Sequence, residues 1–307
     1  MIVIASSVPD VEQILLDAFQ QYAPADSFCS ADSPHALLAT TAACWFPDLE
    51  QLKKLPNLAL VHSMAAGVEH LDLEALLGKY QVCRIVDESH KQGMFSYLLW
   101  GILYYQRHFD RYLENQKQAI WQQLPQQSEA ATAVGIMGLG ELGAYVGQKL
   151  AALGYTVLGW SRTEKACTGI QCFTGESQFD DFLSQTQILI NLLPLTEQTK
   201  GILSNQTFKK LPQGAAVINS GRGAHLNPDD LLEQIKAAHI RGAILDVFPE
   251  EPLDKNHILW HSDRVVITPH IASHASLKAV VEQILANDQR LIAKQRLVNQ
   301  IDLARGY

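Results

Sequence analysis

Four side chains suited to proton transfer and anion binding lie at or just beyond the ends of apolar segments in the second half of the chain. Arg222 lies in "VINSGRGAHL", Asp246 and Glu251 lie in "GAILDVFPEEPL", and His270 lies in "VVITPHIASH". A guanidinium binds carboxylates through a planar fork of donors, and an imidazole beside a carboxylate can hold and transfer a proton. Each residue alone is often a salt-bridge partner, a turn cap or a structural histidine, but the four together predict a catalytic site.

A glycine-rich loop earlier in the chain predicts a nucleotide site. The segment "AVGIMGLGELGAYVGQKL" carries Gly138, Gly140 and Gly143 in G-x-G-x-x-G order, after an apolar run and before an amphipathic pattern. The first glycine permits a tight turn, the second lets backbone approach a pyrophosphate, and the third lets a helix pack on the strand. That helix, beginning at Glu141 and Leu142, then presents its positive end to the phosphates. The alternative is a glycine-rich turn without a ligand.

The end of the next strand indicates which dinucleotide is bound. About 20 residues after the loop, where an acid would hold the ribose 2′-hydroxyl, the chain reads Ser161-Arg162-Thr163. A 2′-phosphate is attracted by arginine and would be repelled by aspartate, and the two hydroxyls can donate to the same phosphate. The segment therefore predicts NADPH in preference to NADH, unless Arg162 is only a solvated residue after a strand.

The elements that position these residues form two sets of alternating strands and helices. A helical pattern at 91–116 and a polar connector at 117–131 separate the sets, and a last helix is predicted at 275–295. The first set has a helix candidate at 9–22. Strand candidates lie at 1–5, 58–63 and 82–86 in the first set, and at 133–137, 155–160, 187–191, 215–219, 241–246 and 265–268 in the second. This alternation predicts an α/β fold with two Rossmann-like doubly wound domains.

The composition argues against several other classes of protein. A chain of 307 residues suffices for two domains, and 47% hydrophobic with 18% charged residues predicts a globular protein. The net charge of −8 argues against a nucleic-acid or anionic-membrane binder. The longest apolar run, 94–105, is too short to span a membrane, and no basic leader precedes it, which predicts a cytoplasmic protein. Five scattered cysteines predict free thiols and no metal site.

Several motifs together resemble the D-isomer-specific 2-hydroxyacid dehydrogenases. They are "GLGELG" (138–143), "NLLPLTEQTKGIL" (191–203), "NSGRGAHL" (219–226), "LDVFPEEPL" (245–253) and "TPHIA" (268–272). The strand end "WSRTEK" and the C-terminal "IDLARGY" are similar to the glyoxylate/hydroxypyruvate reductase A branch. The resemblance implies a homodimer and a nicotinamide cofactor. It also implies a flavodoxin-like substrate domain of residues 1–98 plus 275–307, an NAD(P)-binding Rossmann domain of residues 99–274, and a cleft between them.

The same resemblance implies a role for each matching residue. His270 would be the general acid that protonates the substrate carbonyl oxygen, with Glu251 hydrogen-bonded to it. Arg222 would bind the substrate carboxylate, and Asp246 would hold the nicotinamide carboxamide. Backbone contacts around the cofactor are implied at Leu193, Ser220 and Gly221.

The first domain offers candidates for the substrate side of the site. "HSMAAGVEHLD" (62–72) resembles the family's carboxylate-binding loop, with the N–H groups of Ala66 and Gly67 as donors, although a plain strand-to-helix turn is the alternative. Trp45 stands where the branch has an aromatic wall, and a buried core tryptophan is an equally good interpretation. The segment 87–97 departs from the branch pattern, which leaves the choice of substrate open.

These observations predict an NADPH-dependent reductase of small 2-oxo acids such as glyoxylate or hydroxypyruvate, with NADH as an alternative cofactor. Two other hypotheses stay open: the same chemistry on another 2-keto acid, and a non-catalytic NADP(H)-binding regulator. The presence of Arg222, Glu251 and His270 argues against the regulator, because a sensor needs no proton donor.

Overall fold

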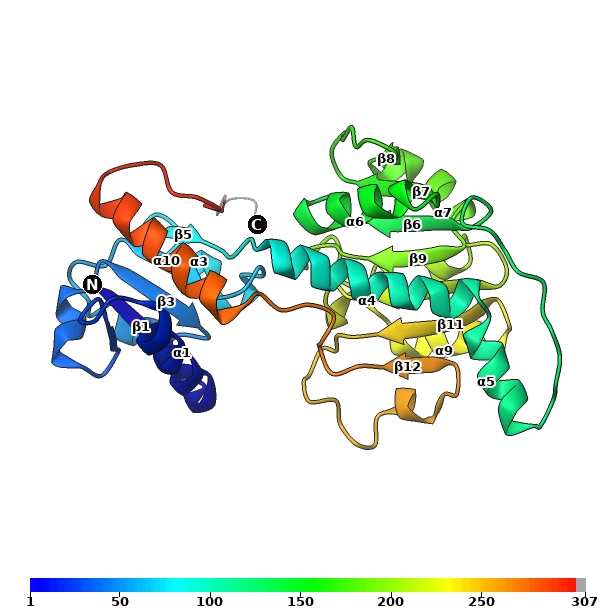
Figure 1. The fold of residues 1–307 in the computed structure, drawn as a ribbon, viewed down its shortest axis with the longest axis horizontal. Coiled ribbons are helices and arrows are strands. Elements are labelled where there is room, and N and C mark those ends of the chain that lie inside the picture. The colour runs from blue at the N-terminus through cyan, green and yellow to red at the C-terminus, as the bar shows by residue number, and fades with distance from the viewer. Residues whose placement is uncertain (302–307) are drawn as a thin grey trace. The chain divides into compact units, whose positions relative to one another are not determined.

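The computed structural model describes residues 1–301, apart from the side chain of Glu69, and the chain forms two compact units (Figure 1). The first unit contains Met1–His90 and the segment from His274 onward, and the second contains Lys91–Ser273. Each is built on a parallel sheet, so the predicted α/β fold with two doubly wound domains is confirmed. Of the C-terminal motif at 301–307, all but Ile301 lies outside the described residues.

The first unit contains a five-stranded sheet in the order β2-β1-β3-β4-β5, which is the flavodoxin-like order. Its strands are β1 (Ile2–Ser6), β2 (Phe28–Ser30), β3 (Thr41–Trp45), β4 (Leu60–Ser63) and β5 (Gln81–Cys83). Buried side chains join one face to α1 (Pro9–Tyr22) and α10 (Leu277–Ile292), and the other to α2 (Leu49–Leu52) and α3 (Leu73–Leu76). The sequence did not indicate β2 and β3.

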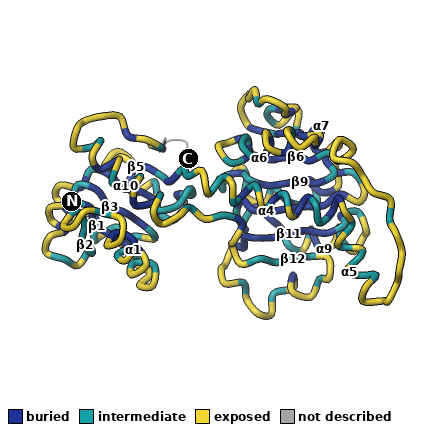
Figure 2. The backbone as a smooth tube through the Cα atoms, viewed as in Figure 1, coloured by how far each residue is buried: buried dark blue, intermediate teal, exposed yellow. Residues whose placement is uncertain are grey.

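Strand β1 shows why the sheet needs helices on both faces. Ile2 and Ile4 point into the core beneath α1 and α10, while Val3 and Ala5 point into the opposite core. Successive side chains of a strand point to opposite faces, so an unbroken apolar run is buried on both sides. The strands are accordingly the most buried part of the chain, with exposed residues concentrated on the surrounding helices and loops (Figure 2).

The second unit contains a seven-stranded sheet in the order β12-β11-β10-β9-β6-β7-β8. Counted within this unit the order is the Rossmann arrangement with one added edge strand, and the strand order reverses between β6 and β9. The strands are β6 (Ala133–Met137), β7 (Thr156–Ser161), β8 (Gln171–Thr174), β9 (Ile188–Asn191), β10 (Ala215–Asn219), β11 (Ile240–Leu245) and β12 (Val265–Ile267). The edge strand β8 was not predicted, because four residues with two polar side chains give little periodic signal.

Helices cover both faces of this sheet. Buried side chains of α4 (Glu88–Gln106) and α6 (Glu141–Ala152) pack on one face, as the ribbon also shows (Figure 1). Those of α7 (Phe179–Ser184), α8 (Asn205–Phe208) and α9 (Pro228–Lys236) pack on the other. Short 3₁₀ turns lie at η1 (Pro34–Leu38), η2 (Glu69–Leu71), η3 (Glu176–Gln178), η4 (Gly223–His225) and η5 (Ile258–His261).

The prediction of one helix over 91–116 is wrong. The chain forms α4 and then α5 (Phe109–Lys117), separated at His108, whose backbone is left-handed with φ 59°. Arg241 on β11 explains the break, because its guanidinium lies 2.9 Å from Nδ1 of His108 and donates from Nε to Asp110 at 2.6 Å. A long-range contact therefore overrides the helical pattern.

Candidate active site

The glycine loop lies where the strand order reverses. Gly138 follows β6 with φ +100°, and a Cβ atom there would lie 2.8 Å from the carbonyl oxygen of Leu192. A Cβ atom at Gly143 would lie 1.9 Å from the carbonyl oxygen of Gly138, so helix α6 can approach the loop only through a glycine. At Gly140 a Cβ atom would meet no protein atom within 4 Å. The loop is therefore closed toward the protein at the first and third glycines and open at the second.

The N-terminus of α6 is available to an anion. Gly140 is its N-cap residue, and no side chain within the described part of the chain caps it. Glu141 in the first turn forms an ion pair with Lys91 Nζ at 3.2 Å, which neutralises the acid nearest the loop. Free N–H groups and the helix dipole favour a phosphate at this position.

The segment after β7 presents a cation beside a buried hydroxyl. Ser161 is buried, and its hydroxyl donates to the carbonyl oxygen of Thr163 at 2.8 Å. Arg162 and Thr163 are exposed. The hydroxyl of Ser161 would have to rotate to donate to a phosphate, whereas the guanidinium of Arg162 can reach one from the surface.

Ser220, the first residue after β10, carries a buried hydroxyl. Ser220 is 7% exposed, and its Oγ atom has no hydrogen-bond partner among residues 1–301. An unsatisfied buried hydroxyl is costly, so it indicates a partner supplied by a ligand. Gly221 lies against Leu193, since a Cβ atom at Gly221 would lie 3.2 Å from the carbonyl oxygen of Leu193, and the contact of Leu193, Ser220 and Gly221 with a dinucleotide stays a prediction.

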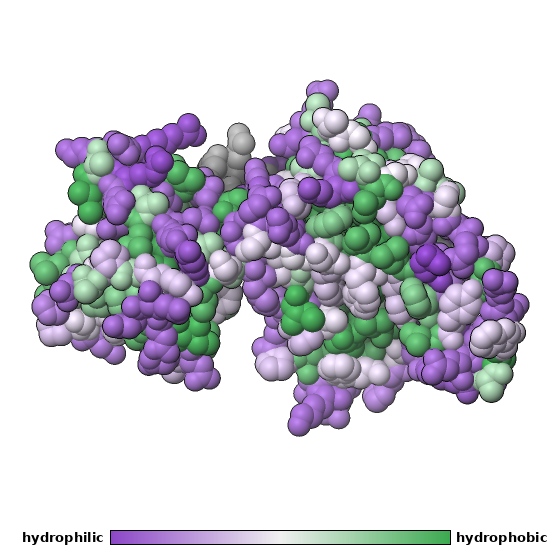
Figure 3. Space-filling model, viewed as in Figure 1, coloured by the Kyte–Doolittle hydropathy of each residue, from purple (hydrophilic) through white to green (hydrophobic). Residues whose placement is uncertain are grey.

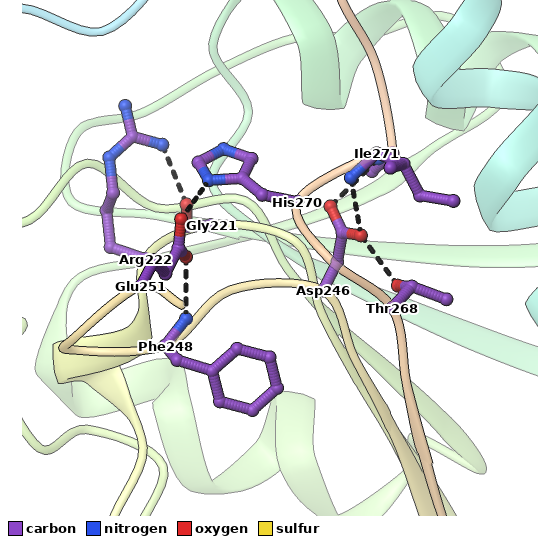
Figure 4. A network of polar contacts seen from close by, with 9 residues as sticks. Gly221, Arg222, Asp246, Phe248, Glu251, Thr268, His270 and Ile271 are labelled. Carbon is purple, nitrogen blue, oxygen red and sulfur yellow. Dashed lines mark hydrogen bonds and ion pairs between the residues drawn. The ribbon is translucent and has the colours of Figure 1, made fainter. Parts of the chain in front are cut away.

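The imidazole of His270 is paired with the carboxylate of Glu251 (Figure 4). Nδ1 of His270 lies 2.8 Å from Oε2 of Glu251, and Oε1 of that residue accepts from the main-chain N–H of Phe248 at 2.9 Å. The two side chains remain 48% and 36% exposed. Because Nδ1 faces the carboxylate, Nε2 is the ring atom left for a substrate.

Asp246 organises the loop that carries His270. Its Oδ1 atom accepts from the hydroxyl of Thr268 at 2.6 Å and the N–H of Ile271 at 2.9 Å, and its Oδ2 atom accepts from the N–H of Ala272 at 2.9 Å. Thr268 also lies 2.6 Å from the hydroxyl of Tyr97, and since Thr268 donates to Asp246, Tyr97 is the donor in this pair. Burial raises the pKa of Tyr97, which keeps that hydroxyl protonated.

The sheet brings the four candidates together. Arg222 follows β10, Asp246 directly follows β11, and His270 follows β12. These three strands are neighbours and parallel, so their carboxyl ends lie at one edge of the sheet. Figure 4 shows Arg222, Glu251 and His270 on adjoining loops there, with Nη1 of Arg222 donating to the carbonyl oxygen of Gly221 at 2.7 Å.

The first unit carries the predicted carboxylate-binding loop. The hydroxyl oxygen of Ser63 accepts from the N–H of Ala65 at 3.0 Å and lies 2.9 Å from the carbonyl oxygen of Gly67. These bonds curl the loop around the serine, and Ala66 and Gly67 stay partly exposed. Arg84 Nη1 lies 3.5 Å from the carbonyl oxygen of Ala66.

Trp45 is part of an aromatic cluster that the sequence did not indicate. Its ring centroid lies 4.4 Å from that of His70 and 5.5 Å from that of Phe46. Phe46 is half exposed and has a left-handed backbone with φ 46°. Trp45 itself is neither fully buried nor fully exposed, so it is not the buried core tryptophan of the alternative interpretation.

Other residues at the site were also missed by sequence reasoning. They are the buried polar side chains Asn191, Asn219 and His225, together with Thr268 and Tyr97. The asparagines had a signal, since each ends an apolar strand, in "ILIN" and "AVIN". Within residues 1–301, no group of three or more His, Cys, Asp or Glu side chains could hold a metal ion. None of the described helices is long and apolar enough to cross a membrane.

A Rossmann unit with an open glycine loop, joined to an arginine, a glutamate and a histidine at its carboxyl edge, defines a nucleotide-dependent oxidoreductase. Residues 99–272 match the family "D-isomer specific 2-hydroxyacid dehydrogenase, NAD binding domain". The chain belongs to the D-isomer-specific 2-hydroxyacid dehydrogenases. The resemblance stated from the motifs is thereby confirmed, and the protein is an NAD(P)-dependent 2-hydroxyacid dehydrogenase.

Three relatives place the chain within this family. It is 39% identical over 275 residues to glyoxylate/hydroxypyruvate reductase A of Yersinia enterocolitica, covering 88% of each chain. A D-isomer specific 2-hydroxyacid dehydrogenase of Xanthobacter autotrophicus, solved with NADPH and MES, is 34% identical, with TM-score 0.92 and coverage of 100% and 99%. The NADPH-dependent glyoxylate/hydroxypyruvate reductase of Sinorhizobium meliloti, solved with NADP and sulfate, is 29% identical, with TM-score 0.88 and coverage of 100% and 99%.

Proposed function

We propose that the protein reduces small 2-oxo acids, such as glyoxylate and hydroxypyruvate, to 2-hydroxy acids with NADPH, and that His270 is the general acid. The observation that carries the proposal is the 2.8 Å pairing of His270 Nδ1 with Glu251. That bond orients the ring so that Nε2 points away from Glu251, where a proton on Nε2 can be donated to the developing alkoxide.

The other residues bind and orient. Arg222 engages the substrate carboxylate, because its charged fork matches a carboxylate and stays protonated. Three of the lone-pair positions of Asp246 serve the loop of His270, which leaves one on Oδ2 for the nicotinamide carboxamide. When bound, the reduced nicotinamide supplies the hydride for the carbonyl carbon. The proton from Nε2 of His270 completes the hydroxyl.

The cofactor preference rests on the segment after β7. Arg162 stands exposed where an acid would otherwise select NAD, and it supplies the charge that a 2′-phosphate requires. The N–H groups at Glu141 and Leu142 receive the pyrophosphate at the uncapped start of α6. The two relatives solved with NADPH or NADP support the same preference.

The domain roles follow from the placement of the glycine loop. The second unit, Lys91–Ser273, corresponds to the NAD(P)-binding domain predicted at 99–274, with Met94 and Leu98 packed in its core. The first unit, Met1–His90 with the segment from His274 onward, corresponds to the substrate domain predicted at 1–98 plus 275–307. In the latter, the N–H groups of Ala66 and Gly67 meet the substrate carboxylate and Trp45 walls the site. The partly exposed loop and the half-exposed aromatic cluster support this assignment.

The surface of the second unit supports a homodimer. Exposed apolar side chains gather on α4, α5 and the connector that follows, and the face over α4 is largely apolar or weakly polar (Figure 3). They are Trp100, Phe109, Leu113, Ile120 and Trp121, the last fully exposed. A monomer rarely leaves such a set in water, whereas a second copy of the chain would cover it.

One experiment tests the proposal. The purified protein is mixed with NADPH or NADH and a panel of 2-oxo acids that differ in the group on C3, and oxidation is followed at the nicotinamide absorbance. Faster turnover of glyoxylate and hydroxypyruvate with NADPH is expected. Turnover of only larger 2-keto acids would shift the substrate class, and tight NADPH binding without turnover of any acid would favour the regulator.

A further inference from the structure

Two buried side chains hold the main chain of Arg222 from both sides. The N–H of Arg222 donates to Nδ1 of His225 at 3.1 Å, and its carbonyl oxygen accepts from Nδ2 of Asn219 at 3.1 Å. Asn219 and His225 have no solvent exposure. The roles assigned above use neither residue.

Asn191 joins these two side chains into a network. Its Nδ2 atom donates to Oδ1 of Asn219 at 2.9 Å and lies 2.8 Å from Nδ1 of His225, while its Oδ1 atom accepts from the N–H of Leu193 at 3.3 Å. Oδ1 of Asn219 also accepts from the N–H of Gly221 at 3.2 Å. A buried polar network whose members satisfy one another favours one arrangement of the loop.

The contacts of His225 identify its protonated nitrogen. A main-chain N–H can only donate, so Nδ1, which receives the N–H of Arg222, carries no proton. The proton therefore lies on Nε2, which donates to the carbonyl oxygen of Pro194 at 3.2 Å. The ring is neutral in this arrangement and serves as an acceptor for Arg222.

The loop is packed so closely on two sides that neither Gly221 nor Gly223 has room for a side chain. A Cβ atom at Gly221 would lie 2.8 Å from Nδ2 of Asn191. A Cβ atom at Gly223 would lie 2.0 Å from the carbonyl carbon of Phe248, just before the segment that carries Glu251. The backbone of Arg222 therefore lies between Asn191 on one side and Phe248, whose N–H donates to Glu251, on the other. This packing restricts its movement.

We propose that His225 and Asn219 are positioning residues that fix the reach of Arg222 toward the substrate carboxylate. The proposal rests on the proposed function of Arg222 as the carboxylate clamp. A bidentate clamp depends on orientation, so loosening its backbone weakens substrate binding while Arg222 itself is kept.

The test compares His225→Asn with His225→Gln. The side-chain oxygen of asparagine falls near the position of Nδ1 and can still accept from Arg222, whereas glutamine places its polar atoms near Nε2. We expect His225→Gln to raise the KM for glyoxylate about tenfold, as for a lost buried hydrogen bond, and His225→Asn to raise it at most about threefold. The Kd for NADPH, from nicotinamide fluorescence, should change little in both. An equal rise in KM in the two variants would overturn the proposal.

Asn219→Asp tests the second contact, the one to the carbonyl oxygen of Arg222. It keeps the proposal testable where the His225 variants fail to fold. Aspartate keeps the acceptor for Asn191 and Gly221, but it turns a negatively charged oxygen in place of the donor toward the carbonyl oxygen of Arg222, so we expect the KM for glyoxylate to rise. An unchanged KM in folded Asn219→Asp would count against the proposal.

A double-mutant cycle separates positioning from a general structural role. In an Arg222→Ala background, His225→Gln should have no further effect on kcat/KM, because it acts through Arg222. Additive losses would overturn the proposal. If Arg222→Ala alone leaves the kinetics unchanged, the clamp itself is wrong. If Arg222→Ala is impaired and His225→Gln is not, only the positioning role fails.

Discussion

The main-chain N–H of His270 donates to the carbonyl oxygen of Asp246 at 2.9 Å, while the carboxylate of Asp246 binds the N–H groups of the next two residues. One acid thus holds the backbone of the histidine and of the residues after it. His270 has φ 54°, a left-handed conformation that costs free energy in a non-glycine residue. The contacts of Asp246 are what sustain that conformation.

Replacing Asp246 by asparagine should reduce both activity and stability. In one orientation the NH₂ group of the amide would face the donors of Thr268 and Ile271, and in the other it would face the N–H of Ala272. Either way, a buried donor is left without an acceptor. We expect a loss of about 1–3 kcal/mol in the free energy of unfolding, with a fall in kcat larger than the change in the Kd for NADPH. Urea unfolding and steady-state kinetics measure the two effects.

A graded series provides the control for that result. Thr268→Val removes one donor to Asp246, and Tyr97→Phe removes only the hydroxyl that donates to Thr268. The loss of kcat should decrease in the order Asp246→Asn, Thr268→Val, Tyr97→Phe. A series in which Tyr97→Phe is the most damaging would contradict an organisation centred on Asp246.

Two substitutions of His270 separate its proton from its backbone. Asparagine tolerates the left-handed region better than alanine, so His270→Asn keeps the loop while removing the acid. Both His270→Asn and His270→Ala should lower kcat by about 10²–10⁴-fold, the usual contribution of a positioned general acid. NADPH binding should be kept. A variant with full turnover would rule out the proton role, and a loss confined to alanine would assign the effect to the backbone.

Much of the fold could be predicted from the sequence because its strands are apolar and its helices periodic. The strand at 133–137 and the helix at 9–22 were predicted with the bounds of β6 and α1. The break at His108 could not be predicted, since Arg241, more than a hundred residues away, creates it. Local pattern carries no record of such a partner.

The charged residues of the candidate site were predictable from the sequence, and the uncharged residues that support them were not. Arg222, Asp246, Glu251 and His270 stand out because charged groups after apolar strands are unusual. Asn219 and His225 are uncharged when they act, and their value lies in bonds to main-chain atoms of Arg222. Those bonds span only three residues, but an uncharged side chain that bonds to main-chain atoms leaves no periodic or charge signal, and the third member of the network, Asn191, comes from β9.

Arg162→Ala should narrow the preference for NADPH. A charge-assisted contact to a 2′-phosphate contributes about 1.5–3 kcal/mol, so the KM for NADPH should rise about tenfold or more while that for NADH changes little. Lys165→Ala, which removes an exposed cation three residues on, is the matched control and should have the smaller effect. Equal use of both cofactors by the unmutated protein would refute a phosphate site at Arg162.

A buried histidine in the first unit predicts acid sensitivity. His62 on β4 has no solvent exposure, lies 2.7 Å from the carbonyl oxygen of Ser63 through Nδ1, and lies 3.1 Å from Nδ2 of Asn287 through Nε2. The amide nitrogen of Asn287 can only donate, and its oxygen accepts from the N–H of Val298, so Nε2 of His62 is unprotonated. Burial lowers the pKa of His62 from 6.5 to about 4.

Stability should therefore fall as the pH drops from about 6.5 toward 4, because the unfolded chain binds a proton at His62 that the folded chain refuses. Between pH 7 and pH 5 this histidine should cost about 2 kcal/mol of unfolding free energy. His62→Gln removes the titrating group and keeps an acceptor for Asn287. The unfolding free energy that this variant loses between pH 7 and pH 5 should therefore be smaller than that of the unmutated protein by about 2 kcal/mol. Urea unfolding at pH 7 and pH 5 measures this difference. The control is His35→Gln, which replaces an exposed histidine. Parallel pH profiles for His62→Gln and the unmutated protein would show that His62 is not the group responsible.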